Sequence, residues 1–212
     1  MDKNVKASNK AKIETLIKKL EARNMTGYYA ETSEDAVKKA LELTPEGSFV
    51  SFGGSVTLTE TGIRDALKSG NYNVKDPWDY KDPIEGTKVK KESLTADVFF
   101  LSANAITMDG EIINVDGNGN RVAAMIFGPD KVVLVIGANK IVSDEAEGRA
   151  RVSTLASPPN NIRLNNETPC ALTGKCVNCL NAKTICNHTV ITRRSGIAGR
   201  IHVILVNEDL GY

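Results

Sequence analysis

The stretch "GSFVSFGGSVTLTETGIRDALKSG", Gly47 to Gly70, decides the fold because it joins a strand to a helix through a glycine turn. Phe49 to Phe52 is a short apolar run typical of a buried strand, and Gly53-Gly54-Ser55 then turns the chain. Thr57 and Glu60 match a capping box, so a helix is expected to run to about Lys68 and to end at Gly70. Strand, turn and helix together form the β-α half of a parallel unit.

The same alternation continues along the chain. A strand is expected in "ADVFFLSANAI", which is apolar on both faces as central parallel strands are. Another buried strand is expected in "KVVLVIGANKIV", and a last strand in "GRIHVILVNEDLGY". Helices are expected in "TSEDAVKKALELTPEG", after the loop in "GNGNRVAAMIFGP", and in "SDEAEGRARVSTLASPP", where Ser143 is the expected cap and Pro158-Pro159 the expected end. "TMDGEIINVD" predicts a hairpin at Asp109-Gly110. We therefore predict an α/β domain with a mainly parallel sheet and helices on both faces.

The chain divides into two expected parts. Residues 1–32 are expected to be an N-terminal helical segment, since Ile13, Leu16, Ile17 and Leu20 recur at helical spacing. Residues 33–212 are expected to form the α/β domain. A cysteine-rich insertion, residues 168–188, interrupts that domain before its last strand, and long insertions of this kind tend to be functional or disordered.

Composition excludes several classes of protein. The chain has 212 residues, a net charge of +1, 41% hydrophobic and 25% charged residues, which is typical of a soluble globular protein. A near-neutral charge argues against a nucleic-acid binder, and no run approaches the ~20 apolar residues of a membrane span. The lysine-rich N-terminus lacks the apolar core of a secretory signal, so a cytoplasmic location is expected. Homo-oligomerisation is left open.

The glycine turn is the first candidate site. Gly53, Gly54 and Ser55 lie where a strand hands over to a helix, and the free N–H groups of a helix start attract anions. The hydroxyls of Ser55 and Thr57 add donors. A phosphate, a carboxylate or a CoA-type ligand would suit this turn, although a tight β-α turn without any ligand has the same sequence.

The segment "SANAITMDGEIINVDGNGNR" is the second candidate site. Ser102 and Asn104 follow a predicted central strand, and ligands in open α/β sheets gather at that edge. Polar residues suited to holding an anion follow, and the candidates are Asn118, Asn120 and Arg121. Glu111 and Asp116 are the candidate acid/base or nucleophilic carboxylates. The alternative is turn chemistry, which favours Asp-Gly and Asn-Gly whether or not anything binds.

All four cysteines, Cys170, Cys176, Cys179 and Cys186, lie in "TPCALTGKCVNCLNAKTICNH" with the spacing C-x5-C-x2-C-x6-C. Clustered cysteines in a cytoplasmic protein favour metal or redox use over disulfides. Four thiolates suit tetrahedral zinc or an iron–sulfur cluster, and we predict such a site here. Disulfides, free thiols and a catalytic thiol at Cys176 or Cys179 are the alternatives.

Three stretches together, "SFGGSVTLTETGI", "LSANAITMDGEIINVDGNGNRVAAMIFGP" and "VLVIGANKIV", resemble the LUD-domain (lactate utilisation) family. The cysteine segment resembles the tail of a single-domain branch, and the resemblance runs from about Asn9 to the carboxyl terminus. It implies a fold similar to the sugar-phosphate isomerase and CoA-transferase group. The glycine turn resembles the anion-binding loop of that fold, and residues 102–104 and 116–121 resemble its substrate edge.

The resemblance also implies a role in lactate or related organic-acid metabolism, with iron–sulfur electron-transfer proteins as partners of some members. One departure matters: isomerases of this fold carry a catalytic carboxylate in a "GAD" motif, and here "SAN" stands in its place. Asn104 cannot exchange a proton at neutral pH, which argues against isomerase-type proton transfer. Two rival hypotheses stay open: a stand-alone CoA-transferase-like or isomerase-like enzyme, and a non-catalytic redox or metal sensor.

Overall fold

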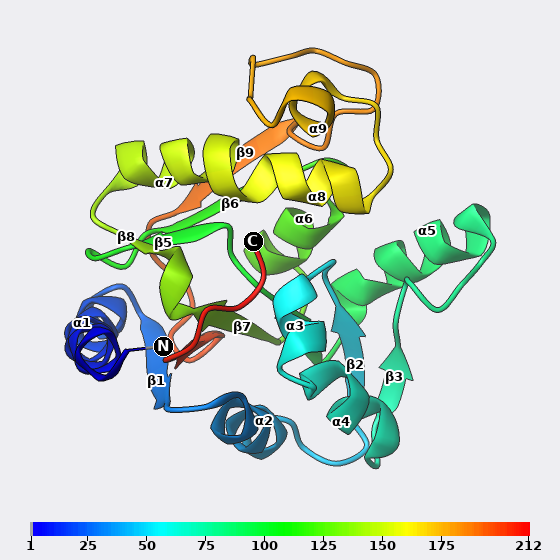
Figure 1. Cartoon of the computed structure of the whole chain (residues 1–212). Helices are drawn as coiled ribbons and strands as arrows, with labels where there is room; N and C mark the ends of the chain where they lie inside the picture. The colour runs from blue at the N-terminus through cyan, green and yellow to red at the C-terminus, as the bar shows by residue number, and fades with distance from the viewer. Residues whose placement is uncertain (1) are drawn as a thin grey trace.

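The structure, a computed structural model, describes residues 2–212 and has a six-stranded, fully parallel sheet at its centre (Figure 1). Its strands are apolar nearly throughout because both faces of the sheet are covered. The α/β prediction is confirmed. In sheet order the strands are β1 (Met25–Ala30), β10 (Ile201–Val206), β7 (Lys131–Gly137), β4 (Val98–Leu101), β2 (Phe49–Phe52) and β3 (Asn73–Lys75).

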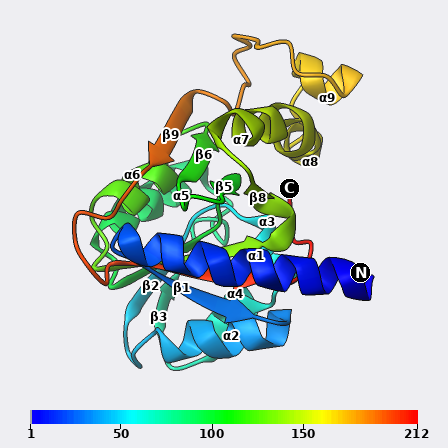
Figure 2. The same cartoon turned by 90° about the vertical axis from the view of Figure 1, so that its left-hand side faces the viewer.

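Helices cover both faces of this sheet, as predicted. On one face α1 (Lys3–Ala22) packs through Ile13, Leu16 and Leu20, and α6 (Asn120–Ile126) packs into the same core through Ala124 and Met125. Figure 2 shows α1 lying across the sheet next to β1. The other face is covered by α2 (Ser33–Glu42), α3 (Val56–Glu60) and α4 (Ile63–Ser69). The single helix expected after the glycine turn is thus two helices, because Gly62 adopts a left-handed conformation, φ 77°, between them.

A second, four-stranded sheet stands against the first in the order β8-β5-β6-β9. Its strands are β8 (Ile141–Val142), β5 (Ala105–Thr107), β6 (Ile112–Asp116) and β9 (His188–Thr192). The predicted hairpin joins β5 to β6, and Gly110 in its turn has φ 87°. The sequence predicted one strand through "ADVFFLSANAI" and one through "KVVLVIGANKIV", and both predictions are wrong. The chain leaves β4 at Leu101 and enters the second sheet at Ala105, and it leaves β7 at Gly137 and enters the second sheet at Ile141. At the break after Leu101, polar side chains make hydrogen bonds with backbone groups that a continuous strand would pair, as described below.

The helix before the cysteines does not end at its two prolines, contrary to the prediction. It begins with α7 (Glu145–Arg151), widens into one π-helical segment, η3 (Val152–Ala156), and continues as α8 (Ser157–Arg163). Proline lacks an N–H and its ring crowds the carbonyl four residues earlier, so a wider turn before Pro158 and Pro159 lets the helix continue. Its N-cap is Asp144, one residue beyond the expected Ser143.

The N-terminal 32 residues hold more than a helix. The predicted helix is present as α1, but β1 follows it and pairs in parallel with β10 along all six residues. The remaining elements are α5 (Pro83–Glu92), η1 (Ser93–Thr95), η2 (Ala138–Lys140) and α9 (Pro169–Thr173). Among residues 2–212, no helix has the length and apolar character needed to cross a bilayer.

Candidate functional site

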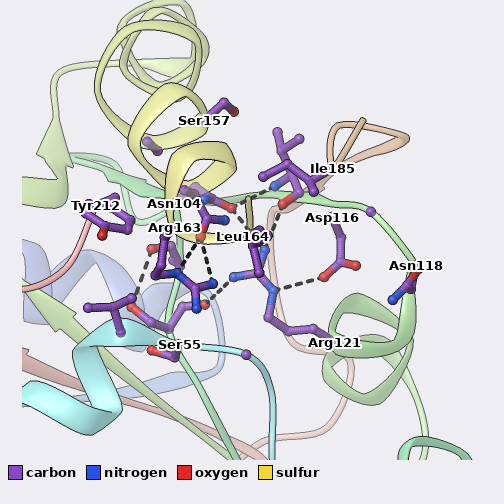
Figure 3. Close-up of a pocket in the computed structure, with 18 of the residues that line it drawn as sticks. Ser55, Asn104, Asp116, Asn118, Arg121, Ser157, Arg163, Leu164, Ile185 and Tyr212 are labelled. Atoms are coloured by element: carbon purple, nitrogen blue, oxygen red, sulfur yellow. Dashed lines mark hydrogen bonds and ion pairs between the residues drawn. The ribbon is translucent and has the colours of Figure 1, made fainter. Parts of the chain in front are cut away.

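A cavity of ≈ 370 Å³ lies at the carboxyl edge of the main sheet (Figure 3). Gly54 and Ser55 follow β2, Ser102 and Asn104 follow β4, and Lys140 ends the short helix after β7. Because all strands of this sheet are parallel, their carboxyl ends meet at one edge, which is where ligands bind in open α/β folds.

Eight of the predicted site residues line this one cavity: Gly54, Ser55, Ser102, Asn104, Asp116, Asn118, Asn120 and Arg121. Gly53 and Thr57 lie directly behind its wall, where Gly53 packs on Arg121 and Thr57 bonds to Lys140. Glu111 and the four cysteines are not among the lining residues. The structure therefore places the glycine turn and the asparagine-rich edge at one cavity.

The two glycines of the turn are needed for close packing. A Cβ at Gly53 would lie 2.8 Å from Cγ of Arg121, and a Cβ at Gly54 would lie 2.8 Å from Cζ2 of Trp78. Neither glycine has a positive φ, so the requirement is for space and not for an unusual backbone conformation. Ser55 caps α3 by accepting from the N–H of Leu58 at 3.2 Å.

Arg121 ties the ends of β4 and β6 together. Its Nε donates to Oδ2 of Asp116 at 3.0 Å, Nη1 to the carbonyl of Ser102 at 3.3 Å, and Nη2 to the carbonyl of Val115 at 2.8 Å and Oδ1 of Asn104 at 3.0 Å. Only 11% of its side chain is exposed. Figure 3 shows these contacts converging beside the cavity. Most of its donors are used by the protein, so Arg121 mainly builds the wall.

Lys140 is one residue of this site that the sequence did not single out. It is 3% exposed, and its Nζ donates to Oγ1 of Thr57 at 2.8 Å and to Oγ of Ser102 at 3.2 Å. Within residues 2–212, no carboxylate lies within ion-pair distance of Nζ. A buried ammonium without a counter-charge is costly, which marks this position as unusual.

The surroundings of Lys140 disfavour its charged form. Burial lowers the pKa of Lys140 to about 7, and the positive charges of Arg151 and Arg121 lower it in the same direction. The carboxylate of Glu60 acts to raise the pKa of Lys140, but its effect is smaller than those of burial, Arg151 and Arg121. A lysine that is half neutral near pH 7 can act as an acid, a base or a nucleophile.

Other elements close the cavity from outside. Asn160 and Arg163 come from α8, Lys90 from α5, and Tyr212 from the C-terminal segment. The cysteine-rich insertion contributes Thr184 and Ile185, and Ile185 packs within 3.2 Å of the position that a Cβ on Gly117 would occupy. These residues are distant in sequence from both predicted segments, so no local pattern could have assigned them to the site.

Glu111 lies at the far end of β6 from Asp116. Their Cα atoms are five residue steps apart along extended chain, a span of about 17 Å. Glu111 pairs with Arg23 at 3.5 Å and with Arg193 at 3.7 Å. The structure thus brings only Asp116 of the two candidate carboxylates to the cavity, and Asp116 is held there by Arg121.

The four cysteines are free thiols that differ in burial. Cys170 is buried, with Asn161 and Thr168 beside its sulfur, and Cys186 is exposed with its sulfur 3.4 Å from Oγ of Ser157. No group of three or more Cys, His, Asp or Glu suited to a metal ion occurs within residues 2–212. The sulfurs as placed do not fit a tetrahedral site, and binding of zinc or an iron–sulfur cluster stays a prediction.

The fold is similar to that of a solved structure over nearly the whole chain. A DUF162 family protein from Deinococcus radiodurans aligns over 95% of this chain and 98% of its own, with 16% identity and a TM-score of 0.52. Ribose 5-phosphate isomerase A from Neisseria gonorrhoeae aligns over 57% of this chain and 62% of its own (17% identity, TM-score 0.35). The delta subunit of eIF2B from Chaetomium thermophilum aligns over 66% and 54% (18% identity, TM-score 0.35).

No curated protein matches this sequence. The model of the LUD domain family matches residues 13–206. That span includes both segments that form the cavity, the buried Lys140 and the cysteine-rich insertion. The chain therefore belongs to the LUD domain family.

Proposed function

We propose that this cavity binds a small organic anion, lactate or a related 2-hydroxy or 2-oxo acid, and that the protein serves organic-acid metabolism as a LUD-domain protein. The observation that carries the proposal is Lys140: a buried amine at the cavity wall with hydroxyl partners and no ion-pair partner within residues 2–212. An anion in the cavity would supply the missing counter-charge.

The charges around the cavity favour the same class of ligand. Four lining residues are cationic (Lys90, Arg121, Lys140 and Arg163) and one, Asp116, is anionic. The charge of Asp116 is balanced by Arg121 at 3.0 Å, which leaves the cavity positive. In a partly desolvated site, such an excess favours anions more strongly than it would in water. The cavity volume lies at the small end of the ligand-pocket range of about 300–1,000 Å³, as a small acid requires.

Polar side chains are available to orient the ligand. Asn104 accepts two hydrogen bonds through Oδ1, from the N–H of Val115 and from Arg121, so the orientation of its amide is set by the protein. Its Nδ2 then points its donors away from those partners. Asn118 and Asn120 line the same wall, and their amides can bind both a hydroxyl and a carboxylate.

Isothermal titration with L-lactate, pyruvate and lactamide tests the proposal. Lactamide has the size and hydroxyl of lactate but no charge, so it is the matched control. We expect the two acids to bind and lactamide to bind at least about 10-fold more weakly, because a buried charge-assisted hydrogen bond contributes about 1.5–3 kcal/mol. Equal affinity for lactate and lactamide, or no binding by either acid, would contradict the proposal.

Lactate binding should weaken as the pH rises above 7. The anion prefers protonated Lys140, whose pKa in the free protein is about 7, while the carboxylate stays ionised over the whole range. Binding is therefore strongest below pH 7 and falls by about tenfold per unit above it, on the order of 100-fold between pH 6 and pH 9. Titrations in buffers of different ionisation enthalpy would also show proton uptake at pH 8. A lactate affinity that does not change with pH would show that the charge of Lys140 does not contribute to binding.

The variant Glu111→Gln should leave lactate binding within about twofold of the wild type. Glu111 is not among the residues that line the cavity, and the affinity depends on groups that touch the ligand or carry charge close to it. Its loss removes two partly exposed ion pairs, with Arg23 and Arg193, so stability should fall by no more than about 1 kcal/mol. Titration and urea unfolding of the same sample check both statements. A tenfold loss of affinity would place Glu111 in the site.

A further inference from the structure

The hydrogen bonds around Lys140 have a fixed direction. Oγ1 of Thr57 donates to the carbonyl of Leu210 at 3.3 Å, and Oγ of Ser102 donates to the carbonyl of Ala103 at 3.4 Å. Each hydroxyl proton is thus used, so both hydroxyl oxygens accept from Nζ of Lys140. A neutral amine has two N–H donors and one lone pair. Both donors are then occupied by the protein, and the lone pair is left for the cavity that Lys140 lines.

The neutral form of this amine is accessible at physiological pH. Lys140 is buried, and the like charges of Arg151 and Arg121 also disfavour its protonated form. Glu60, whose charge favours the protonated form, accepts a hydrogen bond from the N–H of Gly211 at 2.6 Å, and within residues 2–212 it makes no ion pair with Nζ. Desolvation and a cationic neighbour are the two means by which proteins turn a lysine into a nucleophile.

We propose that Lys140 is a nucleophile that forms an imine with the carbonyl carbon of a 2-oxo acid held in this cavity. The inference rests on the proposed function, since it requires that the cavity binds organic anions, and it narrows the ligand to acids that carry a ketone next to the carboxylate. It also gives the site covalent chemistry that binding alone does not require.

The reaction balances without any further reagent. The ammonium first releases one proton, the lone pair of Nζ attacks the ketone carbon, the C–O double bond opens, and a second proton passes from nitrogen to oxygen to give a carbinolamine. The hydroxyl then takes up the proton that the ammonium released and leaves as water, while the nitrogen lone pair forms the C–N double bond of the protonated imine. Lysine ammonium and 2-oxo acid thus give iminium and water, with no net change in protons or electrons.

The site suits this reaction because the nitrogen of Lys140 is positively charged both before the reaction, as an ammonium, and after it, as an iminium. The iminium nitrogen occupies the position of the ammonium, so the carboxylate of the ligand keeps a cation beside it. Arg163 and the amides of Asn118 and Asn120 line the cavity and are available to the carboxylate, while Lys140 engages the ketone. An imine also withdraws electrons from the adjacent carbon atoms, as covalent catalysis by lysine requires.

Reductive trapping tests the inference. The full-length protein is incubated with pyruvate and cyanoborohydride at pH 7, and peptides are then analysed by mass spectrometry. The expected adduct adds the mass of the acid less one oxygen atom, and it should form on Lys140 at least about 10-fold faster than on any other lysine. At pH 7 the neutral fraction of an amine with a pKa of about 7 exceeds that of an ordinary lysine by on the order of 1,000-fold.

Controls separate the two proposals. Lactate, which has no ketone, should give no adduct, and excess lactate should slow trapping by pyruvate. Lys140→Arg should lose the adduct, whereas Lys18→Met, an exposed lysine on α1, should retain it. If lactate and pyruvate bind by titration but Lys140 is labelled no faster than exposed lysines, the nucleophile is wrong and the anion site stands. If neither acid binds, the proposed function itself fails.

Discussion

Replacing Lys140 with methionine is expected to weaken lactate binding by about 2–5 kcal/mol, on the order of 100-fold or more. The ammonium is the most buried cation at the cavity, and Thr57 and Ser102 hold it in place by hydrogen bonds. A cation that is more exposed to water would attract the bound anion less strongly, so it would not make up for the loss of Lys140. Methionine has a similar length and keeps the apolar stem packed. Isothermal titration at pH 6.5, where most of the wild-type lysine is protonated, would give the largest difference.

The same substitution should not unfold the protein. The pKa of Lys140 is lowered to about 7, so below pH 7 the folded state bears the cost of a buried charge that the unfolded chain does not. Removing the charge relieves that cost, which offsets the loss of two hydrogen bonds. As the pH rises from 7 towards 10, the wild type sheds the proton and the stability advantage of the methionine variant should shrink. Thermal unfolding at pH 6 and pH 9 measures this change.

A matched control is Lys18→Met, which removes the same charge from an exposed position on α1. Its lactate affinity should stay within about twofold of the wild type, because screening by water and salt attenuates a distant surface charge. If Lys140→Met binds lactate as the control does, the buried amine has no part in the site. That result would remove the observation on which the proposed function rests.

Replacing Arg121 with methionine is expected to destabilise the fold by about 3–5 kcal/mol. This is the cost of removing one partner of a buried ion pair, because the other charge is then left buried and unpaired. Asp116 is 8% exposed and would be left as an unpaired carboxylate, and Asn104 would lose one donor to its Oδ1. The carbonyls of Ser102 and Val115 would lose partners as well. Urea unfolding followed by circular dichroism provides the measurement.

Two further variants isolate the cause. Arg149→Met breaks an exposed pair with Glu145, at 53% and 47% side-chain exposure, and should cost less than about 1 kcal/mol. The double variant Arg121→Met with Asp116→Asn should recover part of the loss, because it removes the unpaired charge. A loss below about 1 kcal/mol for Arg121→Met alone would mean that the network of Arg121 does not hold the two strand ends together.

Local pattern was sufficient for much of the fold. The apolar runs at residues 49–52, 98–101, 131–137 and 201–206 are strands of one parallel sheet, and the hairpin turns at Gly110 as its Asp-Gly pair predicts. Errors arose where side chains from elsewhere take part. The strand after Leu101 breaks because Arg121 and the side chain of Asn104 occupy backbone groups at residues 102 and 115. The helix passes Pro158 because a π-helical segment makes room for the ring.

The candidate site divides in the same way. The glycine turn and the asparagine-rich edge were recognised as site segments because turn residues at the ends of strands are local signals. Lys140 is not among the predicted site residues, although a lysine in "KVVLVIGANKIVS" is a signal that a search for charges within buried runs would find. No local sequence pattern marks the other lining residues Arg163, Thr184, Ile185 and Tyr212 as part of a site.

By itself, the sequence determined the alternation of strands and helices, the parallel sheet and the membership of the family, because periodicity and turn chemistry act over a few residues. Only the tertiary structure decided that Glu111 lies away from the cavity, that Arg121 holds two strand ends together and that Lys140 is buried with no ion-pair partner among residues 2–212. The physical reason is that burial and charge pairing depend on contacts between residues far apart in the chain. The distance of 83 residues between Lys140 and its partner Thr57 is one such contact.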